Sequence, residues 1–146
     1  MTKAESIARL EKLAAECSQE NSDGYGAVAV STAAVANAAR LIRVLPAQLP
    51  LPDPGAEPDG CVTLEWYASS SWLVSVSVPT EDRLDYLAWL GKRKEHGSWN
   101  FTYEAPASLV ALLTDFVSGA EAAELGGART ALSARNERRR DGRMKK

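Results

Sequence analysis

The sequence predicts an α+β fold: two N-terminal helices, a four-stranded antiparallel β-meander, a C-terminal helix and a basic tail. The first observation is an alternation of apolar and polar residues between positions 62 and 78, which is typical of half-buried strands. The second is the helical spacing of apolar residues before position 45 and after position 106. The third is the shortness of the loops between the expected strands, which favours antiparallel neighbours.

The first helix is expected over residues 3–18, because Thr2 and Glu5 have the spacing of a capping box. Its apolar side would consist of Ile7, Leu10, Leu13, Ala14 and Cys17. A polar loop follows, and Ser31 then has the position of an N-cap for a second helix running to about Leu45. Its buried stripe would consist of Val35, Ala38, Ala39, Ile42 and Leu45.

The segment from Pro46 to Pro58 holds five of the seven prolines and is expected to be an extended, polyproline-like connector. Leu45, Leu49 and Leu51 can hold it against the core. A recognition motif for a proline-binding domain is the alternative, but Pro50-Leu51-Pro52 is too generic to favour it.

A β-hairpin is expected next, with the apolar residues on its two strands sharing one face. Those residues are Val62, Leu64, Trp66, Val74, Val76 and Val78. Because all are even-numbered, the connecting loop has an odd number of residues, and Trp66 pairs with Val74. Ser69 to Ser71 would lie near the tip, where no glycine favours a two-residue turn.

The third strand is expected from Arg83 to Leu90, with Leu84, Tyr86, Ala88 and Leu90 continuing the apolar face. The polar stretch 91–97 reads as a connection, and Ser98 to Tyr103 as a fourth strand with Trp99, Phe101 and Tyr103 on one side. Pro106 fits the first turn of the last helix. That helix would bury Leu109, Leu112, Leu113 and Phe116 and end near Gly119.

The 146 residues fit one domain over residues 1–119, followed by a partly helical or disordered basic tail over residues 120–146. Residues 135–146 include seven basic and two acidic side chains, so this segment carries a charge of +5 and the first 134 residues carry −7. An acidic body with a basic arm is therefore expected.

Neither a membrane-spanning run nor a secretory signal is evident, so a cytoplasmic location is expected. Cys17 and Cys61 are expected to be unpaired and to behave as small apolar residues. No zinc-ligand spacing and no phosphate-binding glycine loop is recognisable, so no cofactor or metal is expected.

The second face of the sheet is the candidate protein interface. It would carry Tyr67, Leu73, Leu87 and Trp89 together with Glu65 and Asp85. Left open, this face is an aromatic patch with a polar rim, typical of a protein interface. Covered by a helix, it is a second core layer. The exposure of Tyr67 and Trp89 distinguishes the two alternatives.

Two further hypotheses concern other residues. Nucleic-acid phosphates could be bound by the basic side chains of the tail, which are Arg135, Arg138, Arg139, Arg140, Arg143, Lys145 and Lys146. An enzyme would have to use a pocket around Glu65 and His96, the single histidine. Catalytic residues are not assigned, and enzymatic activity is left undecided with a non-enzyme favoured.

The order of motifs in residues 24–117 resembles a group of small uncharacterised bacterial proteins. The resemblance rests on Leu45-Pro46 followed by Leu49-Pro50-Leu51-Pro52, then on Asp59-Gly60 and Leu64-Glu65-Trp66 in the hairpin, and on Glu95-His96-Gly97. It implies the helix, proline connector and hairpin order and a setting in mobile genetic elements. It implies no activity, because none is established for the group.

The sequence therefore favours a non-enzymatic protein-binding module that blocks or regulates a bacterial or phage complex, as inhibitors, antitoxins, immunity proteins and anti-CRISPR proteins do. The acidic body would meet a basic surface on the partner and speed association. A nucleic-acid-associated regulator and a small enzyme are the alternatives; a membrane partner is not expected.

Overall fold

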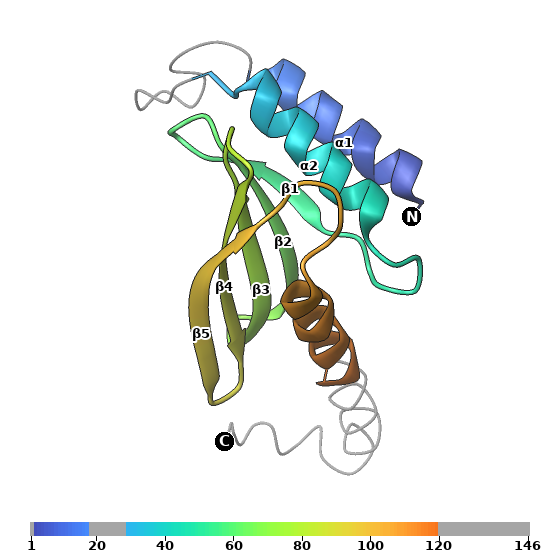
Figure 1. Ribbon diagram of the computed structural model, residues 1–146, viewed down its shortest axis with the longest axis vertical. Helices are drawn as coiled ribbons and strands as arrows, with labels where there is room; N and C mark the ends of the chain where they lie inside the picture. The colour runs from blue at the N-terminus through green and yellow to red at the C-terminus, as the bar shows by residue number, and fades with distance from the viewer. Residues whose placement is uncertain (1, 18–28, 120–146) are drawn as a thin grey trace, which may run out of the picture.

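The computed structural model describes residues 2–17 and 29–119, and shows two helices, an antiparallel five-stranded sheet and a C-terminal helix (Figure 1). The elements in chain order are α1 (Lys3–Glu16), α2 (Thr32–Val44), β1 (Asp53–Ala56), β2 (Val62–Ser69), β3 (Trp72–Val78), β4 (Arg83–Leu90), β5 (Arg93–Asn100) and a helix over residues 107–119. Each strand pairs with the next along the chain, so the sheet is an antiparallel meander as predicted, with five strands instead of four. The fold is of the predicted α+β class. Residues 120–146, which include the predicted tail, lie outside the described residues.

Both N-terminal helices are confirmed, and local hydrogen bonds define where they begin. The Glu5 N–H donates to Thr2 Oγ1 (3.1 Å), and the Thr2 N–H donates to Glu5 Oε1 (2.7 Å), which completes the capping box. The Ser31 hydroxyl accepts from the N–H groups of Ala33 and Ala34 at the start of α2.

The predicted proline connector is wrong in one respect, because it contains strand β1. Asp53 to Ala56 pair antiparallel with Glu65 to Val62, and Pro54 lies opposite Leu64. Proline donates no ladder hydrogen bond, but an edge strand needs donors on one side only, so Pro54 is tolerated there. The expected anchoring holds: Leu45 and Leu49 are buried, and Leu51 packs against the core.

The hairpin register is confirmed residue by residue, since Trp66 lies opposite Val74 and Leu64 opposite Val76. The turn itself is shorter than expected, because Ser69 already pairs with Trp72. A register shift between Tyr67 and Ser69 adds one residue to β2 that has no partner on β3. With this extra residue, the even-numbered apolar residues of both strands still share one face.

Strand β4 has the predicted bounds, but β5 does not. The sequence placed the last strand at Ser98 to Tyr103, whereas β5 begins at Arg93 and ends at Asn100. Gly91 adopts a φ of +70° and allows a tight turn directly after Leu90. As a result Phe101 is buried beyond the strand, and Tyr103 is 82% exposed rather than aligned with Trp99.

The core lies between the helices and one face of the sheet. From the strands it takes Val62, Leu64, Trp66, Val74, Val76, Val78, Leu84, Ala88 and Leu90. From the C-terminal helix it takes the four predicted residues Leu109, Leu112, Leu113 and Phe116. In α1 and α2 the buried apolar residues are Leu10, Ala34, Ala38, Ala39, Leu41 and Ile42. The predicted stripe of α2 is thus largely confirmed, but it is wider than predicted, and Val35 is only half-buried.

None of the helices in residues 2–17 and 29–119 is both long enough and apolar enough to cross a membrane.

Candidate functional site

The face of the sheet opposite the core brings together side chains from β2, β3, β4 and β5. The strand registers arrange them in three cross-strand rows, which we call the open face. The rows are Thr63–Ser77–Asp85–Ser98, Glu65–Ser75–Leu87–His96 and Tyr67–Leu73–Trp89–Lys94. Alternation along each strand produces this set, because the neighbours of these residues point into the core.

All six residues of the predicted interface lie on the open face. Tyr67 is 57% exposed and Leu87 is 48% exposed, while Leu73 and Trp89 are half-buried. A helix-covered second core layer does not fit these exposures. Within the described residues, the apolar end of the open face is therefore accessible to solvent.

Trp89 is held in place at the end of its row. Its indole N–H donates to the carbonyl oxygen of Gly91 (2.8 Å), and the Lys94 ammonium lies 4.1 Å from the centroid of its ring. A cation over a tryptophan ring is attracted by the ring's electron density. The ring is thus positioned before any partner arrives, which lowers the entropy cost of binding.

The opposite end of the open face is polar and internally hydrogen-bonded. The hydroxyls of Thr63 and Ser77 both donate to Glu57 Oε2, at 2.6 and 2.7 Å. Ser98 donates to Asp85 Oδ1 (2.6 Å), and the Arg83 guanidinium also contacts that carboxylate. Asp85 therefore has its own cation, whereas no ion pair to Glu65 is formed among the described residues.

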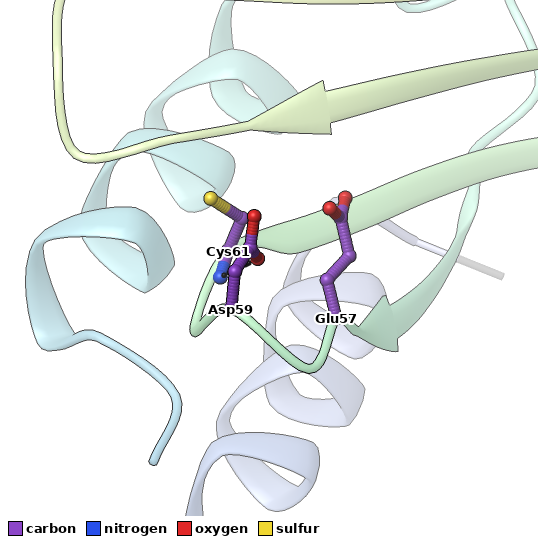
Figure 2. A group of neighbouring side chains, drawn as sticks. All are labelled: Glu57, Asp59 and Cys61. Carbon is purple, nitrogen blue, oxygen red and sulfur yellow. Dashed lines mark hydrogen bonds between the residues drawn. The ribbon is translucent and has the colours of Figure 1, made fainter. Parts of the chain in front are cut away.

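The β1–β2 turn brings together Glu57, Asp59 and Cys61, a group that was not predicted from the sequence (Figure 2). One ligand-type atom from each lies within 4.8 Å of the others. Gly60, with a φ of +92°, reverses the chain, and the Cys61 N–H donates to Asp59 Oδ1 (3.0 Å). The alternating pattern Glu-x-Asp-x-Cys was the signal, but it crossed the boundary between the expected connector, which contained Glu57, and the expected hairpin, which contained Cys61.

The chemistry of this turn favours a neutral thiol. Burial raises the pKa of Cys61 from its ordinary 9.0 to about 11, assisted by the hydrogen bond with Asp59 and by the negative charges of Asp59, Glu57 and Asp85. A soft metal binds the thiolate and not the thiol, and nucleophilic attack also needs the thiolate. Glu57 is in addition occupied by two hydroxyl donors. With no ion bound, the Cys61 thiol is therefore neutral at neutral pH, and Glu57 and Asp59 stabilise the turn through their hydrogen bonds.

The predicted enzymatic pair does not come together. Glu65 is on β2 and His96 is on β5, with Ser75 and Leu87 between them in the same row. Three strand spacings correspond to roughly 14 Å, so the two side chains cannot exchange a proton directly. His96 belongs to a strand on the open face and not to a loop as predicted.

A hollow of about 530 Å³ lies between the start of α1 and the loop that follows α2. Its lining is Thr2, Lys3, Ala47, Leu49, Pro50 and Leu51. Lys3, the one ionisable side chain among the described residues of this lining, already donates to the carbonyl oxygens of Arg43 (2.7 Å) and Leu45 (2.5 Å). Because its ammonium is engaged in holding α1 to the end of α2, the hollow offers little polar recognition.

The predicted nucleic-acid residues between Arg135 and Lys146 lie outside the described residues. No family of proteins, curated protein or solved structure matches this chain in the comparisons, so the resemblance to small bacterial proteins stays a prediction.

Proposed function

We propose that the protein is a non-enzymatic binding module whose open face engages another protein. The observation that supports this most is the row of Tyr67, Leu73 and Trp89 with Leu87 beside it, which exposes apolar and aromatic area next to polar groups. Aromatic residues are enriched in protein interfaces, and charged groups are depleted at their centres. The partner proposed from the sequence is a bacterial or phage complex that the module blocks or regulates.

The arrangement suits binding better than catalysis. The side chains of the open face come from regular strands, so they are held more rigidly than loop residues would be. Glu65 and His96 are too far apart to act as a pair, and the Cys61 thiol is poorly nucleophilic. Association of a nucleic acid with the basic tail remains the alternative, supported by the +5 charge of residues 135–146.

The experiment compares three forms of the full chain as bait in the native host's lysate, with and without nuclease. Leu87→Arg places a charge at the centre of the open face. Tyr103→Arg places the same charge at an 82% exposed site outside it and serves as the matched control. Circular dichroism confirms that all three forms are folded.

The proposal expects a near-stoichiometric protein that is retained by the native chain and by Tyr103→Arg in the presence of nuclease, and is lost with Leu87→Arg. Retention by Leu87→Arg would move the binding site away from the open face. Recovery that disappears with nuclease would instead favour the nucleic-acid alternative.

A further inference from the structure

We infer that a second copy of this chain docks on the open face, so that the protein forms a two-fold symmetric dimer through the surface that it uses for binding. This inference rests on the proposed function in one respect, namely that the open face binds protein. The second copy is identified by the distribution of charge across the face.

The open face is polarised from β2 to β5. On the β2 side, Glu65 has no hydrogen-bond or ion-pair partner among the described residues. On the β5 side, Lys94 and His96 lie in adjacent rows, and both are exposed. Between these edges, β3 and β4 contribute Leu73, Leu87 and Trp89 in two of the rows, and Asp85, which is ion-paired with Arg83, in the third. In the two rows that contain Glu65 and Lys94, the face is thus acidic at one edge, mainly apolar in the middle and basic at the other.

Such a polarity is self-complementary under one two-fold operation. The two sheets face each other, and the axis lies in the plane between them. When this axis runs parallel to the strands and passes between β3 and β4, it places β2 of one copy over β5 of the other. Leu73 then faces Trp89 of the second copy in the middle, and Tyr67 faces Lys94 of the second copy. Glu65 faces His96 of the second copy. The row that contains Lys94 is roughly 6.6 Å from the row that contains Glu65. The long Lys94 side chain spans this distance, so Lys94 of the second copy also reaches Glu65.

The other in-plane axis, perpendicular to the strands, is unfavourable. It would place β2 over β2, so Glu65 would face Glu65 of the second copy, and Tyr67 would face the hydroxyl-rich row that contains Thr63. Like charges across an interface are repulsive, and polar groups opposite an aromatic ring lose their water without gaining partners. Charge therefore selects the axis parallel to the strands, as expected for an isologous interface.

The size of the face sets the expected affinity. Four strands spaced by ~4.8 Å and about seven residues long bury on the order of 900 Å² in total over two copies. This is at the low end of specific interfaces, so a reversible dimer with a dissociation constant in the micromolar range is expected. A heterologous partner that binds the same face would compete with it.

Two charge reversals test the pairing. Glu65→Lys gives a chain with lysine at both edges, and Lys94→Glu gives a chain with glutamate at both edges. Sedimentation velocity on the full chain, at about 10 µM to about 1 mM, measures dimer formation across the range that a small interface requires. Each variant alone is expected to dimerise at least about tenfold more weakly than the native chain, because both symmetry-related contacts become repulsive.

Mixing the two variants is expected to restore dimers, since each contact in the mixed dimer joins a lysine to a glutamate. The chain that carries both reversals is also expected to dimerise more strongly than either single variant, although more weakly than the native chain, because glutamate at position 94 removes the cation over the Trp89 ring. A fold defect cannot mimic this rescue, and thermal unfolding of each variant checks the fold separately. A native chain that stays monomeric at the highest concentration, or variants that dimerise as well alone as mixed, would overturn the inference.

These outcomes are distinguishable from a failure of the proposed function. A monomeric native chain that still loses its lysate partner with Leu87→Arg would contradict the dimer and leave the binding module standing. A dimer that is rescued by mixing, with no partner lost on Leu87→Arg, would support the dimer and contradict binding of a different protein through the same face.

Discussion

The indole N–H of Trp72 donates a hydrogen bond of 3.0 Å to the carbonyl oxygen of Phe116. Trp72 is the first residue of β3, and Phe116 lies in the C-terminal helix. This bond therefore connects the β2–β3 turn to the C-terminal helix. Gly119 lies against the same indole, because a Cβ at this position would be 1.8 Å from Trp72 Cζ2. The site therefore requires glycine for close approach and not for an unusual backbone angle.

Gly119→Ala tests this contact. Alanine favours a helix over glycine by about 1 kcal/mol, but overlap with a well-packed ring costs about 1–3 kcal/mol, and we expect the overlap to dominate. The free energy of unfolding, measured by urea titration, should fall by about 1 kcal/mol. Gly55→Ala is the control, because its Cβ would meet only Thr63 Cβ at 3.9 Å. An equally destabilised control, or a stabilised Gly119→Ala, would contradict the packing described.

Ser31→Ala tests the N-cap of α2. The Ser31 hydroxyl accepts from the N–H groups of Ala33 (3.1 Å) and Ala34 (3.3 Å), and alanine would leave these donors to water. We expect a loss of about 1 kcal/mol in the free energy of unfolding. Ser70→Ala removes a hydroxyl from an exposed turn and should change the free energy by less than about 0.5 kcal/mol. Equal effects from the two substitutions would show that the Ser31 hydroxyl stabilises the fold no more than an exposed hydroxyl does.

Glu57→Ala tests the polar end of the open face. It removes the acceptor of two hydroxyls, those of Thr63 and Ser77, and should destabilise the fold by about 1–2 kcal/mol after allowance for partial exposure. Glu104→Ala removes an exposed carboxylate in the loop after β5 and is the control. A double-mutant cycle with Ser77→Ala should give a coupling of about 0.5 kcal/mol or more. Additive effects would mean that the two side chains do not interact in solution.

The reactivity of Cys61 should be low and should rise only at high pH. A pKa raised from 9.0 to about 11 lowers the thiolate fraction at neutral pH by about 100-fold, and the greater nucleophilicity of the more basic thiolate recovers about tenfold of this. In a Cys17→Ser background, alkylation of the folded chain at pH 8 should therefore be about tenfold slower than alkylation of the same chain in urea.

The pH dependence and one substitution check the cause. The alkylation rate of the folded chain should keep rising as pH passes 9 and reach about half of its plateau near pH 11, where half of the thiol is ionised. Asp59→Asn removes the negative charge beside the thiol and keeps an Oδ1 acceptor for the Cys61 N–H, so it should speed alkylation at pH 8. A folded chain that reacts as fast as the unfolded one would show that Cys61 is not protected by its surroundings.

Local patterns were sufficient for most of the secondary structure. The capping box at Thr2, the N-cap at Ser31 and the period of two from Val62 to Val78 each depend on residues close together in the chain, so the sequence alone specified α1, α2 and the β2–β3 register. The same alternation assigned Tyr67, Leu73, Leu87 and Trp89 to one face of the sheet. Parity alone determines the face, since successive side chains on a strand point to opposite sides.

Only the tertiary structure decided the features that depend on a distant neighbour. Strand β1 exists because β2 offers an unpaired edge to Asp53–Ala56, although proline and glycine argue locally against a strand. Strand β5 begins at Arg93 because the glycine turn lets a polar segment pair with β4. Glu57 meets Ser77, and Trp72 meets Gly119, across segments whose separation in the chain carries no periodic signal. Short-range propensity is encoded in the order of residues, whereas these contacts arise only when the registers and the helix packing bring the segments together.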